Sequence, residues 1–341
     1  MSLGRTVKLN NGIVAPQIGF GTWQAAPGEV EKALEEAIKV GYRHIDAALV
    51  YRAFGLCEFV EGAAVDVPAC ALHREPKRDG IKASGVPRED LFIVSKLWNN
   101  SSLPESIEAD LDLTLSQLKT DYLDVYLVHW PVTFKKEGSN LFPKSADGKQ
   151  ALIDADAPGV VGTWKELVRL TKETKKVRAI GVSNFTVELL DKIIDATGVV
   201  PAMNQIEAHP SLIQPELFKY CKEKGIIITA YSPLGNNTTG RPRIIDNPEI
   251  QAIAKRLGKE PAQVLINWAA HQGFVVIPKS VTPARIKSNF QDFELSEEDF
   301  EEINKVGKAN PARANIPAEY NPPWPVNIFD EESEQKYKKV W

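Results

Sequence analysis

Four polar side chains in the first half of the chain could together move a proton onto a carbonyl oxygen. Asp46, Lys96 and His129 each end a short apolar run, and Tyr51 follows the first of these runs. A free phenol has a pKa of about 10, and a neighbouring ammonium lowers that pKa because it favours the phenolate. We expect Lys96 to supply the ammonium and Asp46 to hold it charged and oriented. His129 would then donate a hydrogen bond to the carbonyl oxygen that Tyr51 protonates.

Each of these residues taken alone has an ordinary structural explanation. An aspartate after a strand often makes a turn or a cap, a lysine is usually solvated, and a buried histidine is commonly a satisfied core group. Their recurrence at consecutive strand ends is what favours one shared catalytic site.

Eight apolar runs of strand length predict the scaffold. They lie near residues 17–21, 43–46, 91–96, 122–129, 178–183, 202–207, 226–231 and 274–278. Helical patterns separate most of them, near residues 27–41, 104–118, 163–172, 187–194, 215–224, 248–257, 261–270 and 297–306. This alternation predicts an α/β fold, a (β/α)8 TIM barrel, in which the carboxyl ends of all strands meet at one mouth. Asn11-Gly12 predicts an N-terminal hairpin that plugs the barrel.

Composition limits the classes of function. The 341 residues are 43% hydrophobic and 25% charged, which fits a single domain over residues 1–341, and a net charge of −4 argues against a nucleic-acid partner. Cys57, Cys70 and Cys221 are too few for a disulfide framework and favour a reducing compartment. We expect a cytoplasmic protein with no membrane segment, and no metal, because the five histidines lack ligand spacing.

The chain resembles the aldo-keto reductases in a series of motifs that occur in order between residues 7 and 329. The matching segments are Gly-Phe-Gly-Thr-Trp (19–23), Gly-Tyr-Arg-His-Ile-Asp (41–46) with Tyr51, Ile-Val-Ser-Lys-Leu-Trp (93–98), Tyr-Leu-Val-His-Trp-Pro (126–131), Gly-Val-Ser-Asn-Phe (181–185), Asn-Gln-Ile-Glu (204–207), Ala-Tyr-Ser-Pro-Leu-Gly (230–235) and Ile-Pro-Lys-Ser (277–280). Residues 321–329 most resemble fungal NADP-dependent aldehyde reductases and glycerol dehydrogenases.

The resemblance implies a reversible, NADPH-dependent reduction of aldehydes or ketoses to alcohols by a monomeric enzyme. Tyr51 would be the proton donor, Lys96 and Asp46 its tuning pair, and His129 the residue that orients the carbonyl. Tyr231 would stack on the nicotinamide ring. The implied cofactor-binding residues are Gly21, Thr22, Trp23, Ser183, Asn184, Gln205, Tyr231, Ser232, Leu234, Lys279, Ser280, Val281, Thr282, Arg285 and Asn289.

Charge favours NADP over NAD. The 2′-phosphate of NADP is a dianion, and Lys279 and Arg285 with the hydroxyls of Ser280 and Thr282 could clamp it near the start of a helix. The alternative is that both cations are solvated surface charges. The chain has Ser288 where the family often has a glutamate, so the adenine contacts differ there.

The substrate pocket should be aromatic. Trp23, Trp98, Trp130 and Trp324 fall on segments expected at the mouth, and flat apolar walls around one polar centre suit aldehydes broadly. Two long segments, 131–158 and 310–341, should also lie there. Loops as long as the first are usually functional lids or disordered.

The family pattern is interrupted directly after Tyr51. Residues 52–78 are unlike the family and make this region longer than expected, and the pattern resumes near Asp79. We hypothesise an insertion, such as translated intron sequence, that disturbs the second helix and the placement of Tyr51; a genuine lid is the rival interpretation. A disturbed site would leave the alternative function, a cofactor-binding or regulatory protein with weak activity.

Overall fold

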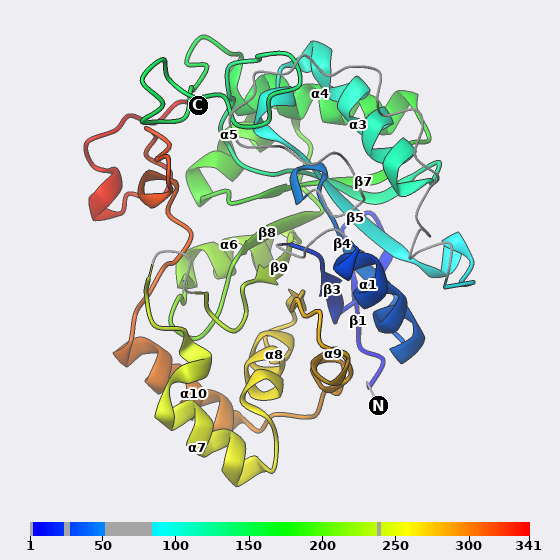
Figure 1. Ribbon diagram of the computed structural model, residues 1–341, viewed down its shortest axis with the longest axis vertical. Coiled ribbons are helices and arrows are strands. Elements are labelled where there is room, and N and C mark those ends of the chain that lie inside the picture. Colours follow the sequence, from blue (N-terminus) through cyan, green and yellow to red (C-terminus); the bar gives the residue numbers. More distant parts are fainter. Residues whose placement is uncertain (1–2, 24–27, 52–83, 237–239) are drawn as a thin grey trace.

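The computed structural model describes residues 3–23, 28–51, 84–236 and 240–341. Its central sheet has eight parallel strands among these residues, neighbours in chain order: β3 (Gly19–Gly21), β4 (His44–Asp46), β5 (Phe92–Leu97), β6 (Leu123–Val128), β7 (Val177–Ser183), β8 (Met203–Glu207), β9 (Ile227–Tyr231) and β10 (Val275–Val276). Parallel bridges from Ile18 to Val276 and from Gly21 to Lys279 join the first strand to the last, so the sheet nearly closes (Figure 1). The predicted (β/α)8 barrel is confirmed.

Helices surround this barrel in the predicted alternation. They are α1 (Glu29–Val40), α3 (Pro104–Leu118), α4 (Gly159–Glu173), α5 (Val187–Thr197), α6 (Pro215–Lys224), α7 (Pro248–Leu257), α8 (Pro261–His271), α9 (Pro283–Asn289) and α10 (Glu297–Ala309). A proline at the first position starts α3, α6 and α7, and a left-handed glycine ends α6 and α7, which is why their predicted bounds are accurate. The expected start of α1 at Pro27 lies outside the described residues.

Several boundaries differ from the prediction by a few residues. Helix α4 begins at Gly159 rather than near Thr163. Gly159 and Gly162 weaken the helical pattern in the sequence, but burial of Val160 in the core stabilises this first turn. Strand β10 is shorter than expected, since only Val275 and Val276 pair with β9.

The N-terminal hairpin plugs the barrel, as expected. Strands β1 (Thr6–Lys8) and β2 (Val14–Pro16) pair antiparallel, and Leu9 is buried in the cluster of barrel-interior side chains. Asn10 donates a side-chain hydrogen bond to Pro201 O (3.0 Å) and Asn11 donates one to Arg178 O (3.2 Å). Both acceptors lie at the amino ends of strands, so the hairpin covers the end opposite the mouth.

The main core lies between the strands and the helices. Trp164 of α4 and Trp268 of α8 are fully buried there. At the mouth, a separate aromatic cluster includes Trp98, Trp130 and Trp324. The scaffold is therefore packed independently of the walls of the mouth.

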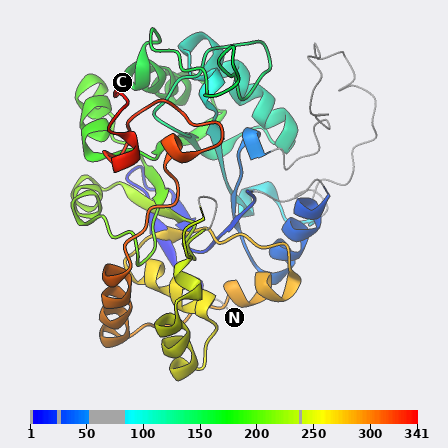
Figure 2. The same ribbon diagram turned by 60° about the vertical axis from the view of Figure 1, so that its left-hand side comes forward.

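Both long segments lie at the mouth. Ala151 N donates a hydrogen bond to Pro323 O (2.9 Å), so segment 131–158 is ordered against segment 310–341. Segment 310–341, orange to red in Figures 1 and 2, runs from α10 towards α5, where Lys339 Nζ lies 2.6 Å from Glu188 Oε2. Residues 52–78 lie outside the described residues, and the hypothesis of a disturbing insertion stays a prediction.

Candidate active site

The barrel brings the four predicted catalytic residues together at its mouth. Asp46 ends β4, Lys96 lies near the end of β5, and His129 directly follows β6. Tyr51 ends a 3₁₀ turn (Leu49–Tyr51) that follows β4. Because the carboxyl ends of parallel strands meet at one edge, residues distant in sequence become neighbours here.

Lys96 and Asp46 form a buried ion pair. Lys96 Nζ donates hydrogen bonds to Asp46 Oδ2 (2.7 Å) and to Ala47 O (3.0 Å). Lys96 is 0% exposed and Asp46 2%. Burial lowers the pKa of Lys96, and the Asp46 carboxylate opposes that shift. Asp46 therefore helps to keep the lysine charged, as the sequence predicts.

Tyr51 lies between this pair and His129. The Lys96 ammonium is 4.9 Å from the centroid of the Tyr51 ring, and the His129 ring lies 5.6 Å away, edge to face. Burial, followed by the charge of Asp46, raises the pKa of Tyr51 well above its ordinary value. The expected lowering of this pKa is wrong: desolvation of the phenolate dominates, and the charge of the Asp46 carboxylate raises the pKa further. Tyr51 is thus held as a neutral phenol, the form that can donate a proton.

His129 is held neutral. Burial, and then the positive charge of Lys96, lowers the pKa of His129 well below its ordinary value. No described residue lies within hydrogen-bonding distance of His129 Nδ1. A neutral imidazole donates from only one ring nitrogen, so His129 can offer one hydrogen bond to a substrate oxygen.

Three amide or hydroxyl side chains predicted to bind nicotinamide are fixed by one another. Asn184 donates to His129 O (2.9 Å) and accepts from the Tyr231 hydroxyl (2.7 Å). The Ser183 hydroxyl donates to Gln205 O (2.8 Å). Gln205 Nε2 donates to Asp46 Oδ1 (2.7 Å), a contact that sequence reasoning missed. One of the side chains predicted to bind nicotinamide, that of Gln205, is therefore hydrogen-bonded directly to the Asp46 carboxylate.

A cavity of about 1110 Å³ opens over this cluster. Asp46, Tyr51 and His129 line it, whereas Lys96 lies beneath them. Its wall also includes eleven of the predicted cofactor-binding residues: Gly21, Thr22, Trp23, Ser183, Asn184, Gln205, Tyr231, Ser232, Leu234, Lys279 and Arg285. Ser280, Val281, Thr282 and Asn289 lie outside the wall of this cavity as the structure describes it.

Two cations lie together on one side of the cavity. Desolvation lowers the pKa of Lys279, the Glu29 carboxylate opposes this shift, and the charge of Arg285 lowers the pKa further. Arg285 donates to the Thr282 hydroxyl (2.7 Å), and Thr282 N donates to the Ser280 hydroxyl (3.1 Å). Thr282 thus supports Arg285 from behind the wall, and Ser280 in turn holds Thr282. A dianion placed between the two cations would relieve their mutual repulsion, so these residues fit the phosphate of an NADP molecule.

The other side of the cavity is aromatic. Trp98, Trp130 and Trp324 line it in edge-to-face contacts, with 5.9 Å between the ring centroids of Trp98 and Trp324. Trp23 lies at the rim, 38% exposed. Sequence reasoning missed further wall residues on the two long segments: Phe134, Phe142, Asn315 and Tyr320. Only their position in loops expected at the mouth could have indicated them.

The described residues contain no group of three or more His, Cys, Asp or Glu that could hold a metal ion. In the same ranges, none of the helices is both long enough and apolar enough to span a bilayer.

Comparisons with known proteins agree with this geometry. The Aldo/keto reductase family model matches residues 17–308. The D/L-glyceraldehyde reductase of Hypocrea jecorina is 50% identical over 342 residues, covering 98% of the chain and 97% of that protein. Aldo-keto reductase family 1 member A1 of Homo sapiens is 39% identical over 309 residues, 89% of each chain.

A solved structure is similar to this chain in both sequence and fold. The aldose reductase of Schistosoma japonicum superposes with a TM-score of 0.80 at 35% identity, over 96% of this chain and 99% of that one. The family model extends over the barrel, the catalytic cluster and the cavity-wall residues before position 308, and the relative at 50% identity covers 98% of the chain. The chain belongs to the aldo-keto reductase family.

Proposed function

We propose that this protein reduces aldehydes or ketoses to alcohols, reversibly, with NADPH as the hydride source. The observation that carries this proposal is the cluster at the floor of the cavity. There a neutral phenol, a neutral imidazole and a buried lysine–aspartate pair lie beside the Asn184 and Gln205 amides. A proton donor, a hydrogen-bond donor and a charge that stabilises the resulting anion are what reduction of a carbonyl requires.

Each residue then has a defined task. Tyr51 transfers its phenolic proton to the carbonyl oxygen, and His129 donates the second hydrogen bond that orients this oxygen. Lys96, held by Asp46, stabilises the phenolate left behind. NADPH, when bound, would supply the hydride, held at its nicotinamide end by Ser183, Asn184, Gln205 and Tyr231.

The preference for NADPH over NADH depends on charge. Lys279 and Arg285 line the cavity, and Arg285 is supported by the Thr282 hydroxyl. NADH lacks the 2′-phosphate that these cations would bind.

Small hydroxyaldehydes are the first substrates to test, because the relative at 50% identity is named a D/L-glyceraldehyde reductase. We also infer a cytoplasmic enzyme from the sparse cysteines, and a monomer with a small carbonyl or alcohol substrate from the family resemblance.

The test is loss of NADPH absorbance with glyceraldehyde or 4-nitrobenzaldehyde, compared between the intact chain and Tyr51→Phe. Turnover by the intact chain that Tyr51→Phe loses supports the proposal. If NADPH binds to both proteins and neither turns over, the alternative of a cofactor-binding protein replaces it.

A further inference from the structure

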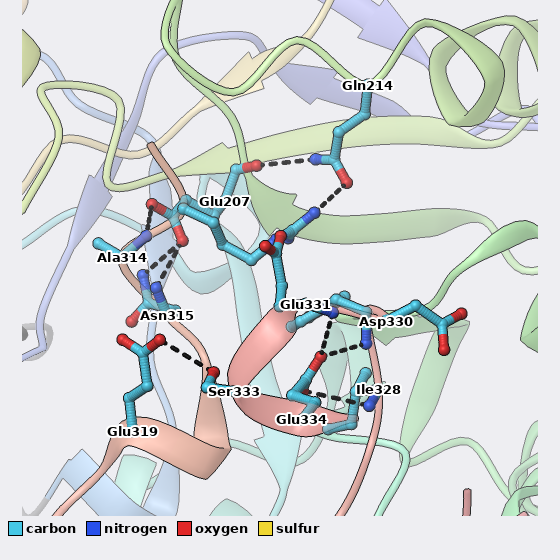
Figure 3. A network of polar contacts seen from close by, with 12 residues as sticks. Glu207, Gln214, Ala314, Asn315, Glu319, Ile328, Asp330, Glu331, Ser333 and Glu334 are labelled. Atoms are coloured by element: carbon cyan, nitrogen blue, oxygen red, sulfur yellow. Dashed lines mark hydrogen bonds and ion pairs between the residues drawn. The ribbon is translucent and has the colours of Figure 1, made fainter. Parts of the chain in front are cut away.

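Glu207, the last residue of β8, is a buried carboxylate that the catalytic mechanism does not use. Oε1 accepts hydrogen bonds from Ala314 N (2.9 Å) and from His209 Nε2 (3.0 Å). Oε2 accepts from Asn315 N (2.8 Å) and from Asn315 Nδ2 (3.0 Å). Burial opposes ionisation, but the bonds from His209, Ala314 and Asn315 lower the pKa of Glu207. The side chain is therefore a charged acceptor with four donors around it, of which Figure 3 shows those of Ala314 and Asn315.

Its partners belong to the segment that forms one wall of the cavity. Ala314 and Asn315 lie 107 and 108 residues further along the chain, at the start of segment 310–341. A few residues later the same segment places Tyr320 and Trp324 in the cavity wall. Trp324 lies edge to face against Trp130, with 5.5 Å between ring centroids. The position of residues 314 and 315 thus fixes where this wall begins.

The strand that carries Glu207 also carries a contact to the reaction centre. Gln205 and Glu207 lie two residues apart on β8, so their side chains point to the same side of the strand. Gln205 binds Asp46, whereas Glu207 binds the wall segment. One strand end therefore sets the distance between the catalytic carboxylate and the substrate wall.

A second group of contacts fixes the same place. Gln214 donates to the main-chain oxygen of Glu207 (3.2 Å) and accepts from Arg313 (3.0 Å), and Arg313 also donates to Glu331 (2.8 Å). Figure 3 shows these residues gathered around Glu207, with Glu334 further along the segment. Glu334 accepts from backbone N–H groups of its own segment, such as Phe329 N at 2.9 Å. Within this network, Glu207 is the buried carboxylate at a strand end that accepts from the segment. Arg241, in the loop after β9, also binds the segment, at Glu319 (3.0 Å) and at Arg313 O.

We propose that Glu207 is a positioning residue for the carbonyl substrate: its carboxylate holds residues 314–324 against β8 and thereby sets substrate affinity. This inference rests on the proposed reductase function. Glu207 acts through the wall segment and does not contact the reacting atoms. Cofactor affinity and the chemical step therefore depend on it weakly.

The first test is Glu207→Gln, which keeps the size of the side chain and removes its charge. One acceptor oxygen becomes an NH₂ group, so at least one donor of residues 314, 315 or 209 loses its partner. We expect the KM for 4-nitrobenzaldehyde to rise about tenfold, because charge-assisted hydrogen bonds are lost. The kcat and the Kd for NADPH, measured by fluorescence titration, should stay within about twofold.

Glu188→Gln is the matched control. Glu188 of α5 also binds segment 310–341, through Lys339, but at its exposed far end. Its loss should leave the KM unchanged. An unchanged KM in Glu207→Gln, or equal losses of aldehyde and NADPH affinity, would overturn the inference, since the latter means general damage.

Asn315→Asp provides a rescue. The single variant Asn315→Asp places a second carboxylate against Glu207, so we expect its KM to rise, as in Glu207→Gln. Combined with Glu207→Gln, the new amide can donate to the new carboxylate, so the double variant should recover most of the affinity. Additive losses in the double variant would contradict a direct contact.

A readout independent of activity separates this inference from the proposed function. Hydrogen exchange of the amides of Ala314 and Asn315 should be about tenfold faster in Glu207→Gln than in the wild-type chain, and unchanged in Glu188→Gln. Equal protection in all three proteins would refute the positioning role. A wild-type chain that reduces no aldehyde would instead refute the proposed function, whatever the exchange shows.

Discussion

Asp46 and Asp124 are both buried carboxylates held by cations, but they lie at opposite ends of the barrel and have different surroundings. Asp124, near the amino end of β6, accepts from Arg88 (2.8 Å), Arg178 (2.6 Å) and Ile93 N (2.8 Å). Both arginines reach it from the surface, and Arg88 stacks on Tyr122, 3.9 Å from the ring centroid. Asp46 instead pairs with a fully buried lysine beneath a large cavity.

This difference shows how one kind of ion pair serves two purposes. At the amino end, Asp124 is surrounded by two arginines and a backbone donor, and it joins β5, β6 and β7. At the mouth, Lys96 faces the Tyr51 phenol, whose proton can leave. The positive charge of Lys96 then stabilises the phenolate that forms. The amino end should contribute stability, and the mouth should contribute activity.

The largest expected effect comes from removing the lysine at the mouth. Lys96→Met should lower kcat/KM at least about a hundredfold, because the phenolate left by proton transfer loses its counter-charge. Steady-state kinetics with NADPH and glyceraldehyde measure this loss.

Arg88→Met is the matched change at the other end of the barrel. It should lower the free energy of unfolding by about 2 kcal/mol, since one partner of a buried pair is lost while Arg178 remains. Urea denaturation measures the stability, and kcat/KM should stay within about twofold. A large loss of activity in Arg88→Met would remove the distinction between the two ends.

Only the mouth side of this contrast was predicted from the sequence, because its residues follow local signals, whereas the Asp124 cluster was not predicted. Proline starts and glycine ends delimit helices such as α3 and α6, and a polar residue after an apolar run identifies Asp46 and His129. These signals fix the barrel, and the barrel fixes the order of residues around its mouth. That is why the four catalytic candidates could be predicted together.

The remainder depends on contacts between distant residues. Segment 131–158 is ordered because Trp98 Nε1 donates to Leu141 O (2.7 Å) and Ala151 meets Pro323, and no local pattern encodes these pairs. The pKa of Tyr51 was predicted in the wrong direction, because burial depends on the whole fold. The roles of Gln205 towards Asp46 and of Glu207 towards Asn315 are long-range for the same reason.

A smaller effect is expected at Lys279, in the part of the cavity wall proposed to bind the 2′-phosphate of NADPH. Lys279→Met should weaken NADPH binding about tenfold or more, and leave NADH binding within about twofold, because only NADPH carries the 2′-phosphate. Fluorescence titration with both cofactors measures the difference. Lys287→Met, an exposed change on the neighbouring helix α9, is the control. Equal weakening of NADH would show that Lys279 does not bind the 2′-phosphate.

The smallest effect concerns a third buried carboxylate, Asp110 of α3, which accepts from the Tyr126 hydroxyl (2.7 Å). Burial raises the pKa of Asp110 to about 6. In the unfolded chain an aspartate has a pKa of about 4, so the fold favours the protonated form. The free energy of unfolding therefore falls as the pH rises from about 4 to about 6. Asp110→Asn removes this loss.

The prediction for Asp110→Asn has a defined sign. The variant should be about 1–2 kcal/mol more stable than the wild-type chain at pH 8 and nearly equal to it at pH 4, by urea denaturation at both pH values. The opposite order would mean that the Asp110 charge is compensated, as the charge of Asp124 is.

The central claim is that Tyr51 supplies the proton at the mouth of the barrel, and a single-turnover measurement tests it most directly. NADPH is bound first to the wild-type chain and to Tyr51→Phe, and its oxidation is followed after glyceraldehyde is added. We predict a rate at least about a hundredfold lower in Tyr51→Phe, with an unchanged Kd for NADPH, since the variant lacks only the phenolic hydroxyl that donates the proton. A Tyr51→Phe rate within about threefold of the wild-type rate would contradict the claim.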